Sequence, residues 1–387
     1  MTLISDHTET VSFKGEEIRL PLFLDHQSTT PLAPDVKAAM LDAMEFPGNA
    51  QSKSHVFGLH AADIVQRARQ QVADLIGAEI DEIHFTSGAT AANHHVLCQA
   101  ACASEKPAHF ISITSEHNSI LSTFDALKQE GHTITLLPIK PDGKLSLEAL
   151  EEALTPETAL VSIQAANNET GVLQDLKRIG EICDSRAVPL HTDAVQALPT
   201  EKVDVTENKI SSMSLSAHKM YGPQGIGALY VQRELNTTLR PAIEGTPPTS
   251  LIAGFGIACD LAHKCRTKDH AHLFALSNRL ISLLKQDLAG DITLNGDQSS
   301  RLPGCLNVSF SRVSAEDLLL ELPMLALSTG AACLSSSGAP SHVLAAMGIT
   351  AAQSNSTIRI GLGRYVTEIE IEYAANMLID AYRRTEK

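Results

Sequence analysis

Short apolar runs alternate with helix-like segments throughout residues 80–200, and this alternation limits the possible folds more than any other feature of the sequence. Strands that alternate with helices in this way are typical of a parallel sheet with helices on both faces. The fold class predicted from this pattern is therefore α/β, with a mostly parallel sheet. The runs expected to form its strands are 83–85, 110–113, 133–137, 160–164 and 188–192.

The pattern changes after residue 241, where a linker leads into a long helical stretch over 251–288. Shorter strand-like runs and helices follow this stretch, which predicts a second and smaller sheet. A chain of 387 residues is also long for one domain. We therefore expect a large domain over 24–245 and a small α+β domain that combines 1–23 with 246–387.

The composition argues against several classes of protein. A net charge of −15 is unlike the basic surface that direct binding to nucleic acid requires. The sequence has no apolar run of about 18 residues, and its start does not resemble a signal peptide. The seven cysteines are odd in number and lack paired spacing, which favours a reducing compartment. We expect a cytoplasmic protein that has no membrane partner.

Neither the cysteines nor the histidines have the spacing of a metal site. Cys98 and Cys102 are four residues apart in an alanine-rich helix pattern, which favours small core residues over metal ligands. His263, His270 and His272 are expected on a solvated helix face. No metal is therefore predicted.

Polar residues follow directly after the predicted strands, and this edge of an open α/β sheet is where ligands bind. The stretch Thr86–Thr90 joins a strand to a helix, and the backbone N–H groups at such a junction can hold an anion. A simple helix cap explains these residues equally well. Neither a dinucleotide-binding glycine motif nor a P-loop is present.

Lys219 follows a run of small and apolar residues, stands beside His218, and precedes a turn at Gly222-Pro223. Lysine is usually a solvated surface charge, but this context predicts a partly buried amine at a strand-to-turn corner. Such an amine loses its proton readily and can form a Schiff base with a carbonyl compound.

The residues at the strand ends together meet the needs of pyridoxal 5′-phosphate. This cofactor requires a lysine for a Schiff base and a carboxylate at the pyridine nitrogen. It also requires donors for its phenolic oxygen, a group stacked on its ring and a site for its phosphate. The sequence offers for these roles, in the same order, Lys219, Asp193, Gln196, His117 and the stretch 88–90.

Longer motifs agree with this interpretation. They are Leu24–Pro31, Gly48–Gly58, Phe85–Thr90, Asn167–Gly171, His191–Gln196, Ser216–Pro223 and Arg359–Arg364. With these motifs the chain resembles the fold-type I pyridoxal phosphate enzymes of the class V aminotransferase group. Within that group it is similar to the cysteine desulfurases of the iron–sulfur-cluster and nitrogen-fixation type. The resemblance extends over nearly the whole chain.

The resemblance implies a role for each of these residues. Lys219 is expected to bind the cofactor covalently and to move the substrate α-proton, and Asp193 to pair with the pyridine nitrogen. His117 is expected to stack on the ring and to carry protons. Gln196 and Asn168 are expected at the phenolic oxygen and the substrate, and Arg359 at the substrate carboxylate. The phosphate is assigned to Ala89, Thr90, Ser216 and His218, with Thr246 reaching the phosphate of the neighbouring subunit in a homodimer.

One cysteine carries the prediction of desulfurase activity. Cys333 lies in the small-residue, glycine-flanked stretch Ser328–Gly338, which suits an exposed loop. The resemblance implies that Cys333 takes the sulfur of L-cysteine as a persulfide, releases L-alanine and passes the sulfur to an acceptor protein. Cys305, at a loop-strand junction, is a weaker candidate for this role.

Two stretches depart from the family pattern. Residues 91–94 read Ala-Ala-Asn-His where relatives begin with Glu and end with Asn, and residues 240–246 replace a glycine-rich segment that ends in Arg-Ser-Gly-Thr. We therefore expect a specialised member whose acceptor serves iron–sulfur assembly, thiolation or DNA phosphorothioation. The alternatives are a selenocysteine lyase, a class V aminotransferase and a non-catalytic assembly subunit.

Overall fold

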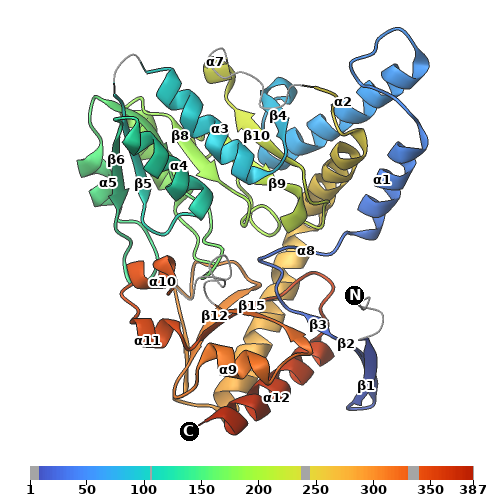
Figure 1. The fold of residues 1–387 in the computed structure, drawn as a ribbon, viewed down its shortest axis with the longest axis vertical. Helices are drawn as coiled ribbons and strands as arrows, with labels where there is room; N and C mark the ends of the chain where they lie inside the picture. The colour runs from blue at the N-terminus through green and yellow to red at the C-terminus, as the bar shows by residue number, and fades with distance from the viewer. Residues whose placement is uncertain (1–7, 105–106, 237–244, 330–339, 387) are drawn as a thin grey trace.

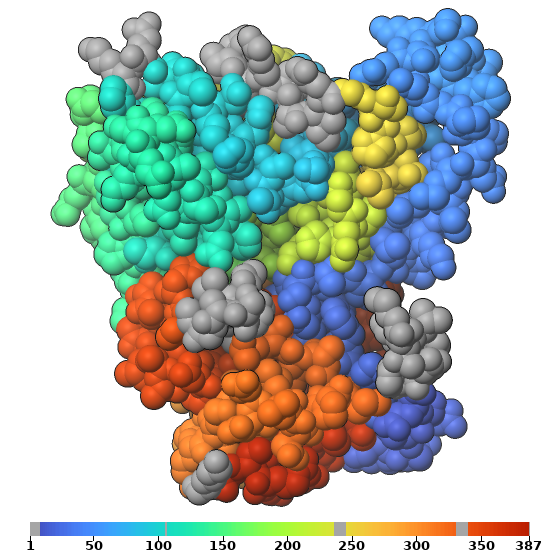
Figure 2. Space-filling model, viewed as in Figure 1, coloured from blue at the N-terminus to red at the C-terminus, as the bar shows by residue number. Residues whose placement is uncertain are grey.

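The computed structural model describes residues 8–104, 107–236, 245–329 and 340–386. Figure 1 shows an upper body built around a central sheet and a lower body that carries the C-terminus. In the space-filling view, the orange and red C-terminal residues gather in the lower body, beneath the cyan and green residues of the upper one (Figure 2). Within the described ranges, no helix is long and apolar enough to cross a membrane.

The upper body contains a seven-stranded sheet. Its strands are β4 (Ile83–Thr86), β5 (His109–Ile113), β6 (Thr133–Leu137), β7 (Thr158–Ser162), β8 (Leu190–Asp193), β9 (Ser212–Ser216) and β10 (Gly227–Val231). They lie in the order β4-β10-β9-β8-β7-β5-β6. Only β10 runs against its neighbours, since it is antiparallel to both β9 and β4. The prediction of a mostly parallel α/β sheet is confirmed.

Helices cover both faces of this sheet. The helices of the upper body are α1 (Pro34–Glu45), α2 (Val56–Ile76), α3 (Ala89–Cys102), α4 (Asn118–Gln129), α5 (Leu147–Ala153), α6 (Leu176–Ser185) and α7 (Arg233–Asn236). Successive strand residues point to opposite faces. Phe110 accordingly packs into a core with α3 and α4, whereas Ile111 packs into a larger core with α2, α5 and α6.

A buried histidine connects three neighbouring strands. His191 on β8 is hydrogen-bonded through Nδ1 to Ser162 Oγ on β7 at 2.9 Å and through Nε2 to Ser214 Oγ on β9 at 3.0 Å. Complete burial lowers the pKa of His191 to about 3, so the ring stays neutral at neutral pH. These bonds fix the relative positions of the strand ends that carry the site.

The lower body contains a four-stranded antiparallel sheet in the order β11-β12-β15-β14. Its strands are β11 (Ile292–Leu294), β12 (Cys305–Phe310), β14 (Ser328–Thr329) and β15 (Thr357–Gly361). The helices of this body are α9 (Ala315–Leu320), α11 (Ala351–Ser354) and α12 (Glu368–Thr385). Helix α10 (His342–Ala346) lies beside them, but its Val343 and Leu344 are buried in the large core of the upper body. An N-terminal hairpin of β1 (Glu9–Phe13) and β2 (Glu16–Leu20) adds Ile18 and Leu20 to the apolar core of this body. Strand β3 (Leu22–Phe23) pairs with β13 (Leu325–Ala326).

Helix α8 (Thr249–Asp287) connects the two bodies. Phe255 and Ala258 in its first half are buried in the large core of the upper body. Leu276 and Leu280 in its second half are buried in the core of the lower body. A single helix of 39 residues is long enough to reach both cores.

Local sequence signals predicted the end of α2 and the start of α5 correctly, but the burial of one cysteine was predicted wrongly. Gly77 follows α2 in the left-handed conformation, with φ of 72°, and Ser146 caps α5 by accepting from the backbone N–H of Ala149. The prediction that Cys98 and Cys102 belong to the core is wrong for Cys102, which is exposed on the last turn of α3. Cys98 is partly buried.

Candidate active site

A cavity of about 760 Å³ opens at the carboxyl edge of the large sheet. Parallel strands end together at this edge, which brings residues that are distant in the sequence to one place. The cavity is lined by all ten residues that the sequence assigned to the cofactor or substrate within one subunit. These are Ala89, Thr90, His117, Asn168, Asp193, Gln196, Ser216, His218, Lys219 and Arg359.

Among the described residues, the predicted Thr246 does not line the cavity. Thr246 lies elsewhere, where its Oγ1 accepts a hydrogen bond from Asn49 Nδ2 at 3.4 Å, so its role toward a neighbouring subunit stays a prediction. Cys333 lies outside the described residues.

Cys305, the weaker candidate for the nucleophile, is completely buried on β12. Burial raises the pKa of its thiol to about 11. A thiol that stays protonated is a poor nucleophile, because the thiolate is the reactive form. The structure therefore gives Cys305 a packing role.

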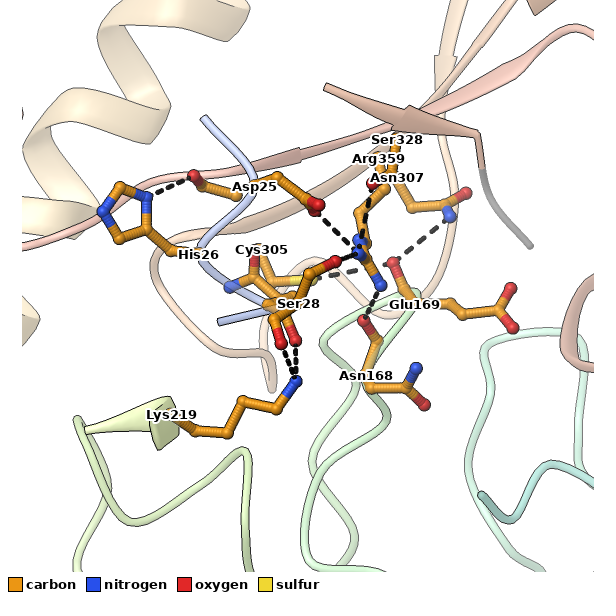
Figure 3. Close-up of polar contacts among 12 residues, drawn as sticks. Asp25, His26, Ser28, Asn168, Glu169, Lys219, Cys305, Asn307, Ser328 and Arg359 are labelled. Carbon is orange, nitrogen blue, oxygen red and sulfur yellow. Dashed lines mark hydrogen bonds and ion pairs between the residues drawn. The ribbon is translucent and has the colours of Figure 1, made fainter. Parts of the chain in front are cut away.

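Lys219 follows β9 in one turn of 3₁₀ helix over 217–219. Its Nζ donates a hydrogen bond to the backbone oxygen of Ser28 at 2.7 Å and another to that of Gln27 (Figure 3). Gln196 Nε2 donates to the same Gln27 oxygen at 3.0 Å. Carbonyl groups of the N-terminal segment thus hold the amine at the cavity wall.

Asp193 ends β8, and both of its carboxylate oxygens accept hydrogen bonds. Oδ2 accepts from Asn93 Nδ2 at 2.7 Å, and Oδ1 accepts from the backbone N–H of Val195 at 3.1 Å. Asn93 also donates to Ser119 Oγ at 3.0 Å. This network orients the carboxylate and connects it to the loop that carries His117.

His117 precedes α4 and caps it, since its Nδ1 accepts a hydrogen bond from the backbone N–H of Ser119 at 3.2 Å. A neutral ring then carries its proton on Nε2. Burial lowers the pKa of His117, the charge of Asp193 opposes this shift, and the charge of Lys219 adds to it. The neutral imidazole that results uses Nδ1 as an acceptor and keeps the Nε2 proton, which it can donate.

The turn before α3 offers donors to an anion. Gly88 precedes the helix with φ of 148°, and no side chain among the described residues caps it. The backbone N–H groups of Ala89 and Thr90 begin a helix of 14 residues, whose dipole favours negative charge at this end. His218 lines the same cavity, and burial lowers its pKa to about 4.

Arg359 on β15 is only 1 % exposed although it carries a charge. Its Nη2 donates to Asp25 Oδ1 at 2.7 Å and to Ser28 Oγ at 2.6 Å, and its Nη1 donates to the backbone oxygen of Asn168 at 3.1 Å (Figure 3). The ion pair with Asp25 offsets part of the cost of burying the guanidinium group. A guanidinium group held in this way at a cavity wall is suited to a carboxylate ligand.

Three buried polar residues were missed as parts of the site. Asn93 holds Asp193, as described above. Glu116 is completely buried, its Oε1 accepts from the backbone N–H of Gln164 at 2.6 Å, and burial raises its pKa well above the usual value. Glu169 is buried beside Asn168. Both acids stand next to predicted site residues, but a sequence motif does not show which neighbouring acid points inward.

Comparisons with known proteins agree with this geometry. A family model described as aminotransferase class-V matches residues 22–245 and 242–374. A cysteine desulfurase of Mus musculus is 41% identical over 386 residues, which cover 97% of this chain and 84% of the relative. The cysteine desulfurase IscS of Rickettsia typhi is 42% identical over 384 residues, which cover 95% of this chain and 93% of the relative.

The chain belongs to the cysteine desulfurases of the class-V aminotransferase family. Solved structures of similar fold include a NifS-like protein, with a TM-score of 0.86, 28% identity and coverage of 94% of this chain and 99% of that one. A structure titled SspA in complex with cysteine has a TM-score of 0.78 and 31% identity over 89% of this desulfurase chain and 100% of its own. The family and fold predicted from the motifs are confirmed.

Proposed function

We propose that this protein is a pyridoxal phosphate-dependent cysteine desulfurase that converts L-cysteine to L-alanine and keeps the sulfur as a persulfide on Cys333. The observation that carries the proposal is the meeting of Lys219, Asp193 and Arg359 around one cavity. An amine and a carboxylate suit the cofactor, and a buried cation suits the carboxylate of an amino acid. The identity of 41–42% with cysteine desulfurases supports this choice of reaction.

The cavity residues fit pyridoxal phosphate. The volume of about 760 Å³ is enough for the cofactor together with an amino acid. Asp193, oriented by Asn93, would pair with the protonated ring nitrogen. The phosphate would bind at the N-terminus of α3, and its proposed ligands are Ala89, Thr90, Ser216 and His218.

A glycine keeps this phosphate site close to the sheet. Gly227 on β10 faces the turn before α3, and a Cβ atom on it would lie 2.9 Å from the backbone of Gly88. The backbone oxygen of Leu215 on β9 lies closer still to that position, so any other residue would force β10 away from both β9 and the turn. The turn that is proposed to hold the phosphate therefore lies directly against the sheet edge.

When bound, the cofactor supplies an electron sink for negative charge at the α-carbon of an amino acid. Lys219 would hold the cofactor and take the proton from that carbon, as general base. Arg359 would bind the substrate carboxylate, with Asn168 beside it, and so orient the α-carbon. His117 would carry the proton at the substrate sulfur, and Gln196 would donate to the phenolic oxygen.

Cys333 would complete the reaction. As a thiolate it attacks the sulfur of L-cysteine, so that a sulfur–sulfur bond forms while the carbon–sulfur bond breaks. The β-carbon would take up a proton in place of the sulfur, the α-carbon would regain the proton that Lys219 removed, and the product would leave as L-alanine. The persulfide sulfur would then pass to an acceptor protein in iron–sulfur assembly, thiolation or DNA phosphorothioation. A net charge of −15 disfavours direct contact with DNA, which favours transfer to a protein.

We also propose that the enzyme is a homodimer in the cytoplasm. Exposed apolar side chains gather on α1 and at the start of α2, as patches at protein interfaces do. They are Leu41, Met44, Phe46, Val56, Phe57 and Leu59. Thr246 contacts Asn49 in the loop between these helices, which supports its role at the neighbouring subunit. Sedimentation of the purified protein tests the dimer, and a monomer at micromolar concentration would contradict it.

The proposed domain division places 24–245 in the large domain and 1–23 with 246–387 in the small domain. The burial of Ile18 and Leu20 in the core of the lower body supports the assignment of the N-terminal segment. Limited proteolysis tests the division, and stable fragments with other ends would contradict it.

Product analysis tests the proposed function. With L-cysteine and a reductant, we expect alanine and sulfide in equal amounts. Cys333→Ser is expected to lower sulfide release by at least about 10²-fold, because the serine hydroxyl is a much weaker nucleophile. The exposed Cys102 provides the matched control, and Cys102→Ser is expected to leave turnover unchanged. Formation of a keto acid without sulfide would favour a class V aminotransferase, and full activity of Cys333→Ser would contradict the proposal.

A further inference from the structure

The segment Asn167–Gly171 after β7 docks onto the lower body through its backbone carbonyl groups. Three of these carbonyls accept hydrogen bonds from three different side chains. The bonds are Arg359 Nη1 to Asn168 O at 3.1 Å, Asn307 Nδ2 to Glu169 O at 3.2 Å and Arg301 Nη2 to Thr170 O at 3.2 Å. The position of this segment and the position of Arg359 are therefore linked (Figure 3).

The side chain of Glu169 adds a contact that the mechanism above does not use. Its Oε2 accepts a hydrogen bond from Ser341 Oγ at 2.5 Å. The same hydroxyl accepts from the backbone N–H of Leu344 at 3.1 Å and thereby caps α10. Ser341 thus uses its hydroxyl both as donor and as acceptor, and both Glu169 and Ser341 are buried.

The pair sits one peptide away from the contact that orients Arg359. The carbonyl that accepts from Arg359 Nη1 belongs to Asn168, which precedes Glu169. A rotation of the backbone at Glu169 would move this carbonyl. The Nη1 group would then lose its acceptor, while Nη2 would keep Asp25 and Ser28.

We propose that the hydrogen bond between Ser341 and Glu169 positions Arg359 for the substrate carboxylate, by fixing the backbone at Asn168 and Glu169 against the N-terminus of α10. This inference rests on the proposed function, because it takes Arg359 as the carboxylate ligand. Glu169 and Ser341 are positioning residues here, since neither lines the cavity.

The energetics of burial agree with a dedicated contact. Burial raises the pKa of Glu169 to about 7, while the bond from Ser341 and the charge of Arg359 oppose the shift. A buried carboxyl group without a partner is strongly destabilising, so the bond from Ser341 satisfies a group that would otherwise favour movement of the segment.

Spectral titration of the cofactor-loaded enzyme tests the proposal with two ligands that differ only in the carboxylate, L-alanine and ethylamine. Ser341→Ala is expected to raise the half-saturating concentration of L-alanine about tenfold, as loss of one hydrogen bond to a charged group predicts. The value for ethylamine is expected to stay within about twofold. The KM for L-cysteine is expected to rise with that for L-alanine, with kcat nearly unchanged.

Matched variants separate positioning from general damage. Ser341→Gly removes the same donor at a helix cap that tolerates glycine, and we expect the same result from it. Glu169→Gln keeps an acceptor for Ser341, and we expect this variant to retain most of the affinity for L-alanine. Ser314 caps α9 in the same way, through the backbone N–H of Asp317, and Ser314→Ala is expected to have no effect on either ligand.

The proposal is overturned if Ser341→Ala and Ser341→Gly leave L-alanine binding unchanged, or weaken L-alanine and ethylamine equally. Arg359→Lys distinguishes this failure from a failure of the proposed function. If Arg359→Lys removes the preference for L-alanine but the Ser341 variants do not, only the inference falls. If Arg359→Lys also keeps the preference, Arg359 is not the carboxylate ligand and both fall.

Discussion

The two sides of the cavity are built in different ways. The sheet-edge side consists of residues that follow successive strands of one sheet, namely Ala89, Thr90, His117, Asn168, Asp193 and Lys219. The arginine side consists of Arg359 on β15 of the lower body, held by Asp25, Ser28 and the Asn168 carbonyl. One side is ordered by the sheet itself, and the other depends on contacts between distant parts of the chain.

This difference explains how the two sides can serve different partners. Neighbouring parallel strands bring the sheet-edge groups into fixed positions, which suits a rigid cofactor. Arg359 depends on contacts between the two bodies, so its orientation can be disturbed without disturbing the sheet. Variants of the two sides are therefore expected to separate cofactor binding from substrate binding.

The largest effect is expected from the sheet-edge side. Lys219→Ala removes both the group that would hold the cofactor and the general base, so turnover is expected to fall at least about 10³-fold. The visible absorption of the lysine-bound cofactor is expected to disappear with it, as a spectrum of the purified variant will show. Lys177, an exposed lysine on α6, provides the control, and Lys177→Ala is expected to retain both properties. Retention of the visible band by Lys219→Ala would show that another group binds the cofactor.

The raised pKa of the buried Glu169, which lies between the two sides, predicts that the stability of the protein depends on pH. The pKa of Glu169 is about 7 in the folded protein, against an ordinary value of 4.5. Between pH 4.5 and pH 7 the folded state therefore binds more protons than the unfolded state. The contribution of Glu169 is fully present below pH 4.5 and is lost as the pH rises through 7, which amounts to at most about 3 kcal/mol of unfolding free energy.

Urea unfolding at pH 5 and pH 8 measures this contribution. Glu169→Gln is expected to lose less stability than the unmodified protein between the two values, because glutamine does not titrate. The exposed Glu152 on α5 provides the control, and Glu152→Gln is expected to follow the unmodified protein. An equal loss in all three proteins would mean that Glu169 does not titrate in this range.

The next effect isolates the arginine side. Arg359→Lys keeps the charge but loses the planar group that donates to Asp25, Ser28 and a carboxylate together, so KM for L-cysteine is expected to rise about 10- to 100-fold. The visible absorption of the cofactor is expected to stay unchanged, in contrast to Lys219→Ala. Steady-state kinetics and a spectrum of the same sample check both points. Arg384 lies on the surface of α12, and the control variant Arg384→Lys is expected to leave the KM unchanged. A rise in KM accompanied by loss of cofactor would show that the two sides are not separable.

The smallest effect concerns the network within the sheet-edge side. Asn93→Ala removes the donor to Asp193 Oδ2, and kcat is expected to fall about five- to tenfold with KM nearly unchanged. Gln99→Ala, further along α3, is expected to behave like the unmodified protein. A change confined to KM would assign Asn93 to substrate binding instead.

The sheet-edge side was predictable from the sequence because each residue follows its own strand signal. Asp193 comes after an apolar run, and Lys219 follows a strand with alternating apolar residues. Gly77 and Ser146 marked their helix boundaries for the same local reason. Sequence periodicity did not show that β10 runs against its neighbours.

The arginine side was predictable only as a single residue implied by resemblance. The contacts that hold Arg359 join residues more than 190 positions apart, and no local pattern encodes them. The same holds for Ser341 and Glu169, which are 172 positions apart. Cys305 could be set aside only after its burial was known. The role of Cys333 stays a prediction.

The most direct test of the account is therefore a single-turnover reaction with L-cysteine, followed by mass spectrometry of the peptides. The account predicts one additional sulfur atom on the peptide that contains Cys333, removable by a reductant, with alanine formed in equal amount. A peptide from Cys333 without added sulfur, while alanine and sulfide are still produced, would contradict it.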